Sequence, residues 1–145
     1  MRRYGWVVYA YCLMTNHYHA LFQIPEEGGL SDGVRLLNGL YSRVMNRKYG
    51  RTGHLFHNRF HAAQMETESH LMAACAYIVI NPVRAGICEK PEDWRWSSYR
   101  ASAGLVSSPP FLAVAKLHSL FVRRRDVAVA AYCRLTDRLV SDTNT

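Results

Sequence analysis

The pattern of hydrophobic and polar positions predicts a β-hairpin near the start of the chain. Residues 5–12 and 17–24 are rich in β-branched and aromatic side chains, and a short Met14-Thr15-Asn16 segment separates them. Because successive side chains of a strand point to opposite faces, one face of the second strand collects His17, His19, Leu21 and Gln23. The other face has the composition of a core, with Tyr18, Ala20, Phe22 and Ile24. We therefore expect the histidine face to be open and to carry a site.

Apolar residues at helical spacing predict two longer helices. The first begins at a Ser31 cap and ends before Gly50, and the second runs from about Glu68 to Ile80 and stops before Pro82. A further strand is predicted over 59–65, and short helices are predicted near 112–120 and 127–139. These elements indicate an α+β fold, a mostly antiparallel sheet with helices on one face as in ferredoxin-like folds.

The charge of the chain favours a nucleic acid partner. Lysine and arginine number 18 against 11 aspartates and glutamates, and 15 of the 18 are arginines, which bind phosphate in a bidentate manner. No acidic residue occurs between Asp32 and Glu66, a stretch that contains Arg43, Arg47, Arg51 and Arg59. A solvated basic surface is the alternative interpretation.

Cysteine spacing predicts reduced thiols, and hydropathy predicts that the chain does not span a membrane. The four cysteines show neither a C-x-x-C spacing nor a dense disulfide framework, so we expect reduced thiols and a cytoplasmic location. No stretch has the roughly 18 to 20 consecutive apolar residues that span a bilayer, and we expect no membrane partner.

Two pairs of residues have the spacing of a catalytic site. His17 and His19 share one strand face and can reach one metal ion, whereas Tyr77 and Asn81 stack at i and i+4 on one helix. A metal beside a tyrosine suggests phosphoryl transfer, with the phenol as nucleophile. Two imidazoles and an amide oxygen leave open coordination positions, which suits Mg²⁺ or Mn²⁺ better than a closed zinc site. Each residue also has a structural interpretation: half-exposed histidines, a packed tyrosine ring and a helix-capping asparagine.

Four ordered blocks of sequence resemble one known family. Residues 9–21, 53–60, 77–86 and 96–100 are similar to successive motifs of the HUH single-tyrosine transposases, in particular the REP-associated tyrosine transposases. The resemblance implies a catalytic domain over 1–104, with 105–145 as a C-terminal helical extension. It also implies that His17, His19 and Asn81 bind the metal and that Tyr77 attacks the phosphate.

Members of this family cut single-stranded DNA next to hairpins, which leaves a 5′-phosphotyrosine and a free 3′-hydroxyl that can reverse the reaction. For this chain the resemblance therefore implies single-stranded or hairpin DNA as the partner, and some members form homodimers. We add Arg84 to the four arginines above as candidates for DNA binding, chosen for charge and position. His57 and His61 depart from the family pattern. With His54 they have a spacing that could suggest a second metal site, but we favour the interpretation that these histidines form a cluster that faces phosphate.

The resemblance leaves two alternatives and one expectation about the start of the chain. A derivative that binds DNA hairpins without cutting them is one alternative, and a rolling-circle initiator or relaxase is the other. Family members usually carry a further strand and a longer helix before the segment that corresponds to Arg3-Tyr4-Gly5-Trp6. We therefore expect this chain to lack that strand and to leave an edge of the histidine strand unpaired.

Overall fold

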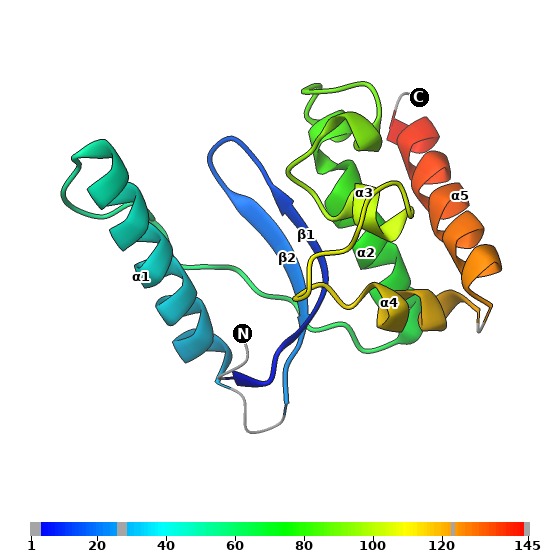
Figure 1. The fold of residues 1–145 in the computed structure, drawn as a ribbon, viewed down its shortest axis with the longest axis horizontal. Coiled ribbons are helices and arrows are strands. Elements are labelled where there is room, and N and C mark those ends of the chain that lie inside the picture. Colours follow the sequence, from blue (N-terminus) through cyan, green and yellow to red (C-terminus); the bar gives the residue numbers. More distant parts are fainter. Residues whose placement is uncertain (1–3, 26–28, 123, 144–145) are drawn as a thin grey trace. The chain divides into compact units, whose positions relative to one another are not determined.

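The computed structural model describes residues 4–25, 29–122 and 124–143 and confirms the predicted α+β fold (Figure 1). The chain divides into two compact units. The smaller unit comprises Met1–Trp6 and Ile24–Gln64, and the larger unit comprises Val7–Gln23 and Met65–Thr145. The histidine pair and the Tyr77–Asn81 pair both belong to the larger unit. None of the helices in the described ranges is both long and apolar enough to cross a membrane.

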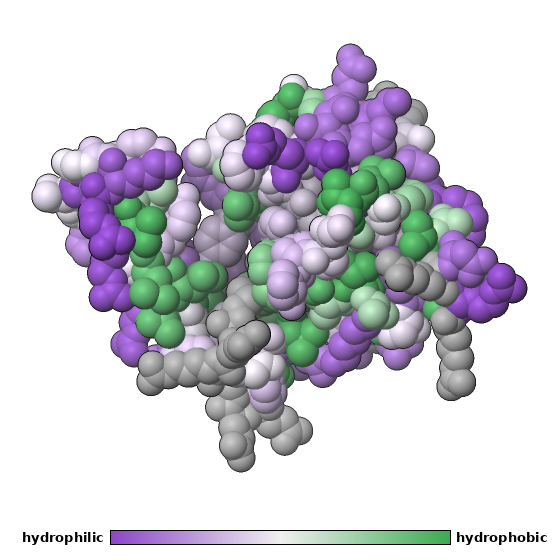
Figure 2. All heavy atoms as spheres, viewed as in Figure 1, coloured by the Kyte–Doolittle hydropathy of each residue, from purple (hydrophilic) through white to green (hydrophobic). Residues whose placement is uncertain are grey.

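The smaller unit is built on helix α1, Leu30–Tyr49. Gly50 ends this helix in the left-handed conformation, as predicted, because glycine adopts a positive φ without a Cβ clash. The predicted Ser31 cap is wrong, since the N-cap is Gly29 and no side chain caps the helix. Gly33 lies directly under the Trp6 ring, where any Cβ would overlap the indole. Figure 2 shows hydrophobic side chains gathered along one side of α1 and hydrophilic ones along another.

The strand predicted over 59–65 is wrong. These residues form neither helix nor strand, and all of them except Met65 are exposed, including Phe60. A strand needs a neighbour for its backbone groups and a face that buries its apolar side chains, and this segment has neither in the described structure.

The predicted hairpin is confirmed. Strand β1, Val7–Leu13, pairs antiparallel with β2, Tyr18–Gln23, and the turn closes with a 2.8 Å bond from Met14 N to His17 O. The other edge of β1 pairs at two points, where Ser97 lies antiparallel to Cys12 and Leu112 lies parallel to Val8. In the described residues the sheet has two strands, and β1 also has backbone partners along its other edge.

Helix α2, Glu68–Arg84, covers one face of the hairpin. Its residues Cys75, Ile78 and Val79 form the main core with Ala10, Cys12 and Leu21 of the strands. The predicted C-terminal helices are present as α4, Val114–Phe121, and α5, Arg125–Thr143, and both pack against the same core. Two short helical segments lie between α2 and α4. They are the 3₁₀ helix η2, Pro91–Asp93, and the helix α3, Tyr99–Ser102. The domain boundary at residue 104 stays a prediction.

The expectation that the histidine face is open is wrong. Residues opposite one another in an antiparallel pair share a face, and His19 pairs with Cys12, which is fully buried against α2. Leu21, on the same face, also packs into that core. The opposite face carries a smaller cluster in which Val8 packs with Ala101, Leu112 and Val114. His19 thus lies on the side of the hairpin that α2 covers, where α2 carries Tyr77 and Asn81.

Helix α2 also continues through Pro82, so the predicted stop at Ile80 is wrong. Proline has no N–H, and the carbonyl of Ile78, four residues earlier, loses its helical donor. The Asn81 side chain supplies that donor, because its Nδ2 lies 3.2 Å from Ile78 O. The asparagine before the proline therefore repairs the hydrogen bond that the proline removes, and the helix extends to Arg84.

Candidate functional site

The two histidine side chains converge at the turn end of the hairpin. His17 Nε2 and His19 Nε2 are 3.1 Å apart, and the rings lie edge to face. Two nitrogens that bind one metal at about 2.1 Å each lie about 3.0 Å apart when they subtend a right angle. The observed separation is close to that expected of two neighbouring ligands of one ion, so the two imidazoles could bind one metal.

Asn16 holds His17 in the form that can bind a metal. Its Oδ1 lies 2.8 Å from His17 Nδ1, and because an amide oxygen only accepts, the ring proton is on Nδ1. The lone pair of Nε2 then faces His19. Burial lowers the pKa of His19, and the nearby His17 adds to this effect, so the neutral ligand form of His19 is favoured. Asn16 is a residue that the sequence prediction missed, although its place directly before His17 in a turn was visible.

Tyr77 and Asn81 lie one turn apart on α2. Tyr77 is 43% exposed, so this tyrosine is accessible from solvent. Asn81 Nδ2 donates to Tyr77 O at 3.0 Å as well as to Ile78 O. These contacts use the amide nitrogen, and no hydrogen bond in the described ranges uses the amide oxygen. The same contact that repairs the helix thus leaves the oxygen available, and this is the atom a metal would use.

Arg84 lies one further turn along the same face of α2. Its guanidinium carbon is 4.9 Å from the centre of the Tyr77 ring, which is cation–π geometry. The contact restricts the orientation of the exposed phenol and places a positive charge beside it. Arg84 was predicted as a DNA contact from charge and position, and its stacking on Tyr77 could not be read from the sequence pattern alone.

The structure brings the two residues of each pair together, but no hydrogen bond joins one pair to the other in the described ranges. Within the described ranges, no hydrogen bond or ring contact joins either histidine to Tyr77 or Asn81, and no group of three or more His, Cys, Asp or Glu side chains could hold a metal. A site with two imidazoles and one amide oxygen contains only two residues of these types. In the same described ranges, His54, His57 and His61 do not form a group that could hold a metal.

The remaining candidate arginines belong to the smaller unit. Arg43 and Arg47 stand one turn apart on α1, and Arg51 and Arg59 follow the helix; all four side chains are exposed. The Asn46 side chain donates to Gly53 O at 2.9 Å and holds the loop between them. The unit therefore presents exposed guanidinium groups from a helix and from an anchored loop.

Comparison with known proteins identifies the family. Residues 1–81, more than half of the chain, match the family model described as "Transposase IS200 like", and the chain belongs to this family. A Haemophilus influenzae protein, provisionally named a REP-associated tyrosine transposase, is 26% identical over 106 residues. That alignment covers 66% of this chain and 60% of the relative, so it spans less than two-thirds of the relative's length. No solved structure matches.

Proposed function

We propose that this protein cleaves and rejoins single-stranded DNA, next to a hairpin, through a covalent bond to Tyr77. The observation that carries the proposal is the histidine pair at metal-ligand spacing on the face of the hairpin that packs against the helix with Tyr77 and Asn81. The membership of the chain in the IS200-like transposase family supports the same chemistry.

In the proposed step, the Tyr77 hydroxyl oxygen attacks a DNA phosphorus atom. The tyrosine loses its proton as the new O–P bond forms, the bond from phosphorus to the 3′-oxygen breaks, and that oxygen gains a proton to become a 3′-hydroxyl. The products are a 5′-phosphotyrosine and a free 3′ end. Because one phosphodiester replaces another, the 3′-hydroxyl of a second strand can reverse the step without an external energy source.

His17, His19 and the amide oxygen of Asn81 would hold a divalent ion, Mg²⁺ or Mn²⁺. When bound, such an ion withdraws charge from a non-bridging phosphate oxygen and orients the scissile bond. Asn16 keeps the lone pair of His17 directed at the ion position, and Arg84 holds the Tyr77 ring beside a positive charge. The chain's own residues thus position the nucleophile and the ligands before DNA arrives.

A cleavage assay tests the metal assignment. A hairpin oligonucleotide with labelled single-stranded flanks is incubated with the protein and Mn²⁺, with and without EDTA, and cut strands are resolved on a denaturing gel. We expect cleavage that EDTA abolishes and that His19→Ala slows by about 100-fold or more at limiting Mn²⁺. Cleavage by His19→Ala at the unaltered rate would overturn the metal site, and the exposed His70→Ala is the matched control.

A further inference from the structure

A pocket lies on the far side of β1 from the histidine face. Its floor is Tyr11, and its volume is about 400 Å³, within the range of small-molecule sites. Tyr11 and Cys12 are adjacent in the strand and point to opposite faces, and Cys12 faces α2. The pocket is therefore separate from the candidate catalytic site.

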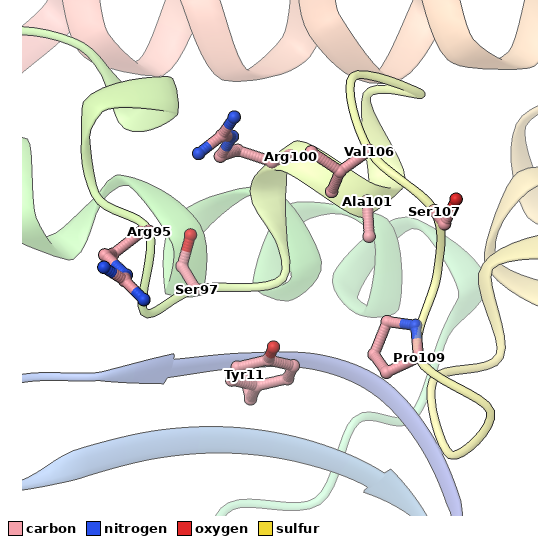
Figure 3. A pocket seen from close by; sticks show the side chains of 8 residues that line it. All are labelled: Tyr11, Arg95, Ser97, Arg100, Ala101, Val106, Ser107 and Pro109. Carbon is pink, nitrogen blue, oxygen red and sulfur yellow. The ribbon is translucent and has the colours of Figure 1, made fainter.

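The pocket forms where the chain leaves the edge of β1 and later returns to it. Ser98 binds β1 through its backbone N–H and its hydroxyl, both directed at Tyr11 O, and the chain rejoins the strand where Ala113 N donates to Val8 O at 2.9 Å. Between these anchors the segment bows outward over Tyr11, as Figure 3 shows. Ser97, Arg100 and Ala101 line the departing side, and Val106, Ser107 and Pro109 line the returning side.

The lining and two aromatic residues beside it, Trp96 and Phe111, combine positive charge with flat and apolar surface. Arg95 and Arg100 line the pocket, and no acidic residue does. The Arg95 guanidinium stacks on Trp96, 4.7 Å from the ring centre, and Trp96 is 49% exposed. At the other end, Tyr11 contacts the ring of Phe111, which is 52% exposed. Exposed aromatic rings beside arginines form the surface on which bases stack and phosphates pair in single-stranded nucleic acid binding.

The position of the pocket connects it to the candidate catalytic site. Trp94 Nε1 donates to Leu13 O, and Leu13 N donates to Trp96 O, so residues 94–96 lie against the end of β1 that leads into the histidine turn. Arg95 of this segment also lines the pocket, so one short segment contacts both the end of β1 and the pocket. We propose that this pocket binds an unpaired nucleotide of the DNA strand that flanks the cleavage position, with its base against Tyr11 or Phe111 and its phosphate at Arg95 and Arg100. This inference rests on the proposed function and adds a second DNA subsite to it.

Binding measurements without metal separate this subsite from the chemistry. Affinity for fluorescein-labelled oligothymidylate is measured by anisotropy in EDTA for the unaltered chain, for Arg95→Gln/Arg100→Gln, and for Arg134→Gln/Arg138→Gln. The control pair removes the same charge from exposed positions on α5. We expect the pocket variant to lose affinity by about tenfold and the control by less than about twofold. Equal losses of affinity in the two variants would overturn the subsite. They would show that Arg95 and Arg100 contribute only non-specific electrostatic attraction to DNA.

A second measurement tests stacking. An oligonucleotide with 5-iodouracil is crosslinked by light to the Tyr77→Phe variant, and the attached peptide is identified by mass spectrometry. We expect attachment within residues 94–111 or at Tyr11, and Phe111→Ala should reduce it. Attachment confined to other segments would refute the subsite and leave the proposed cleavage intact. It would favour a protein partner for the exposed Trp96 and Phe111 rings. If the unaltered chain bound no single-stranded DNA, both proposals would fail.

Discussion

At the residue scale, the chemistry depends on which nitrogen of His17 carries its proton. Asn16 Oδ1 binds Nδ1, which directs the Nε2 lone pair toward His19. Without this partner the ring can rotate and change tautomer. Groups that orient metal-binding histidines typically contribute 10-fold to 100-fold to metal affinity. The Asn16 side chain therefore belongs to the proposed site even though it would not touch the ion.

We predict that Asn16→Ala weakens Mn²⁺ binding by about tenfold, measured by calorimetry and by the Mn²⁺ dependence of cleavage. DNA affinity in EDTA should not change, because the residue contacts no phosphate in this account. Asn58→Ala, another exposed asparagine, is the matched control. Unchanged Mn²⁺ binding in Asn16→Ala would show that the 2.8 Å contact has no part in the site.

Residue spacing predicted the members of each pair, since i and i+2 share a strand face and i and i+4 share a helix face. It could not predict Asn16 or the stacking of Arg84, because both depend on rotamers chosen in the folded chain. Spacing also could not relate the histidine pair to the tyrosine pair. Their common side of the hairpin follows from the burial of Cys12 and Leu21 against α2, which is a tertiary property.

At the element scale, the end of α2 depends on one side chain. Asn81 donates to Ile78 O, the carbonyl that Pro82 leaves without a helical donor. If residue 82 has an N–H, it can donate to that carbonyl itself, and the asparagine is no longer needed there. The two positions should therefore be energetically coupled.

We predict that Asn81→Ala lowers the free energy of unfolding by about 1 kcal/mol in the natural background and by less in a Pro82→Ala background. Urea denaturation of the four proteins in the double-mutant cycle measures the coupling. Mn²⁺ affinity should fall in both backgrounds, since the amide oxygen is lost in each. Equal stability costs with and without the proline would contradict the hydrogen-bond repair.

Local patterns predicted the hairpin and the long helices well because each repeats its hydrophobic period over several residues. They failed at Pro82, where a side chain compensates for a helix breaker, and at Ser31, where Gly29 precedes the helix instead. They also failed over 59–65, where β-like composition found no neighbouring strand. Hydrophobic periodicity does not report a side-chain donor such as Asn81 or the backbone conformation at a helix start, and it does not report whether a segment has a neighbouring strand.

At the scale of the whole molecule, the excess of arginine is distributed over both units. Arg43 and Arg47 of α1 lie in the smaller unit, while the candidate catalytic residues lie in the larger one. If both units bind DNA, charge removal from α1 weakens binding without touching the chemistry. Each phosphate contact that is lost should reduce the slope of log affinity against log salt by about 0.7 for a single strand.

We predict that Arg43→Gln/Arg47→Gln reduces the salt slope of single-stranded DNA binding by about 1.4 and leaves the cleavage rate at saturating DNA unchanged. Anisotropy titrations at several salt concentrations give the slope, and Arg134→Gln/Arg138→Gln again serves as the control. A slope equal to that of the unaltered chain would show that the stretch without acidic residues, between Asp32 and Glu66, is a solvated basic surface.

The central claim is that Tyr77 becomes covalently attached to DNA, and one measurement tests it directly. The unaltered chain and Tyr77→Phe are each incubated with Mn²⁺ and a labelled hairpin substrate, denatured, and analysed for a protein–DNA adduct by gel and peptide mass. We predict an adduct on the peptide that contains Tyr77 in the unaltered chain, and none in Tyr77→Phe, with DNA binding preserved. An adduct that persists in Tyr77→Phe, or one attached to a different tyrosine, would contradict the account.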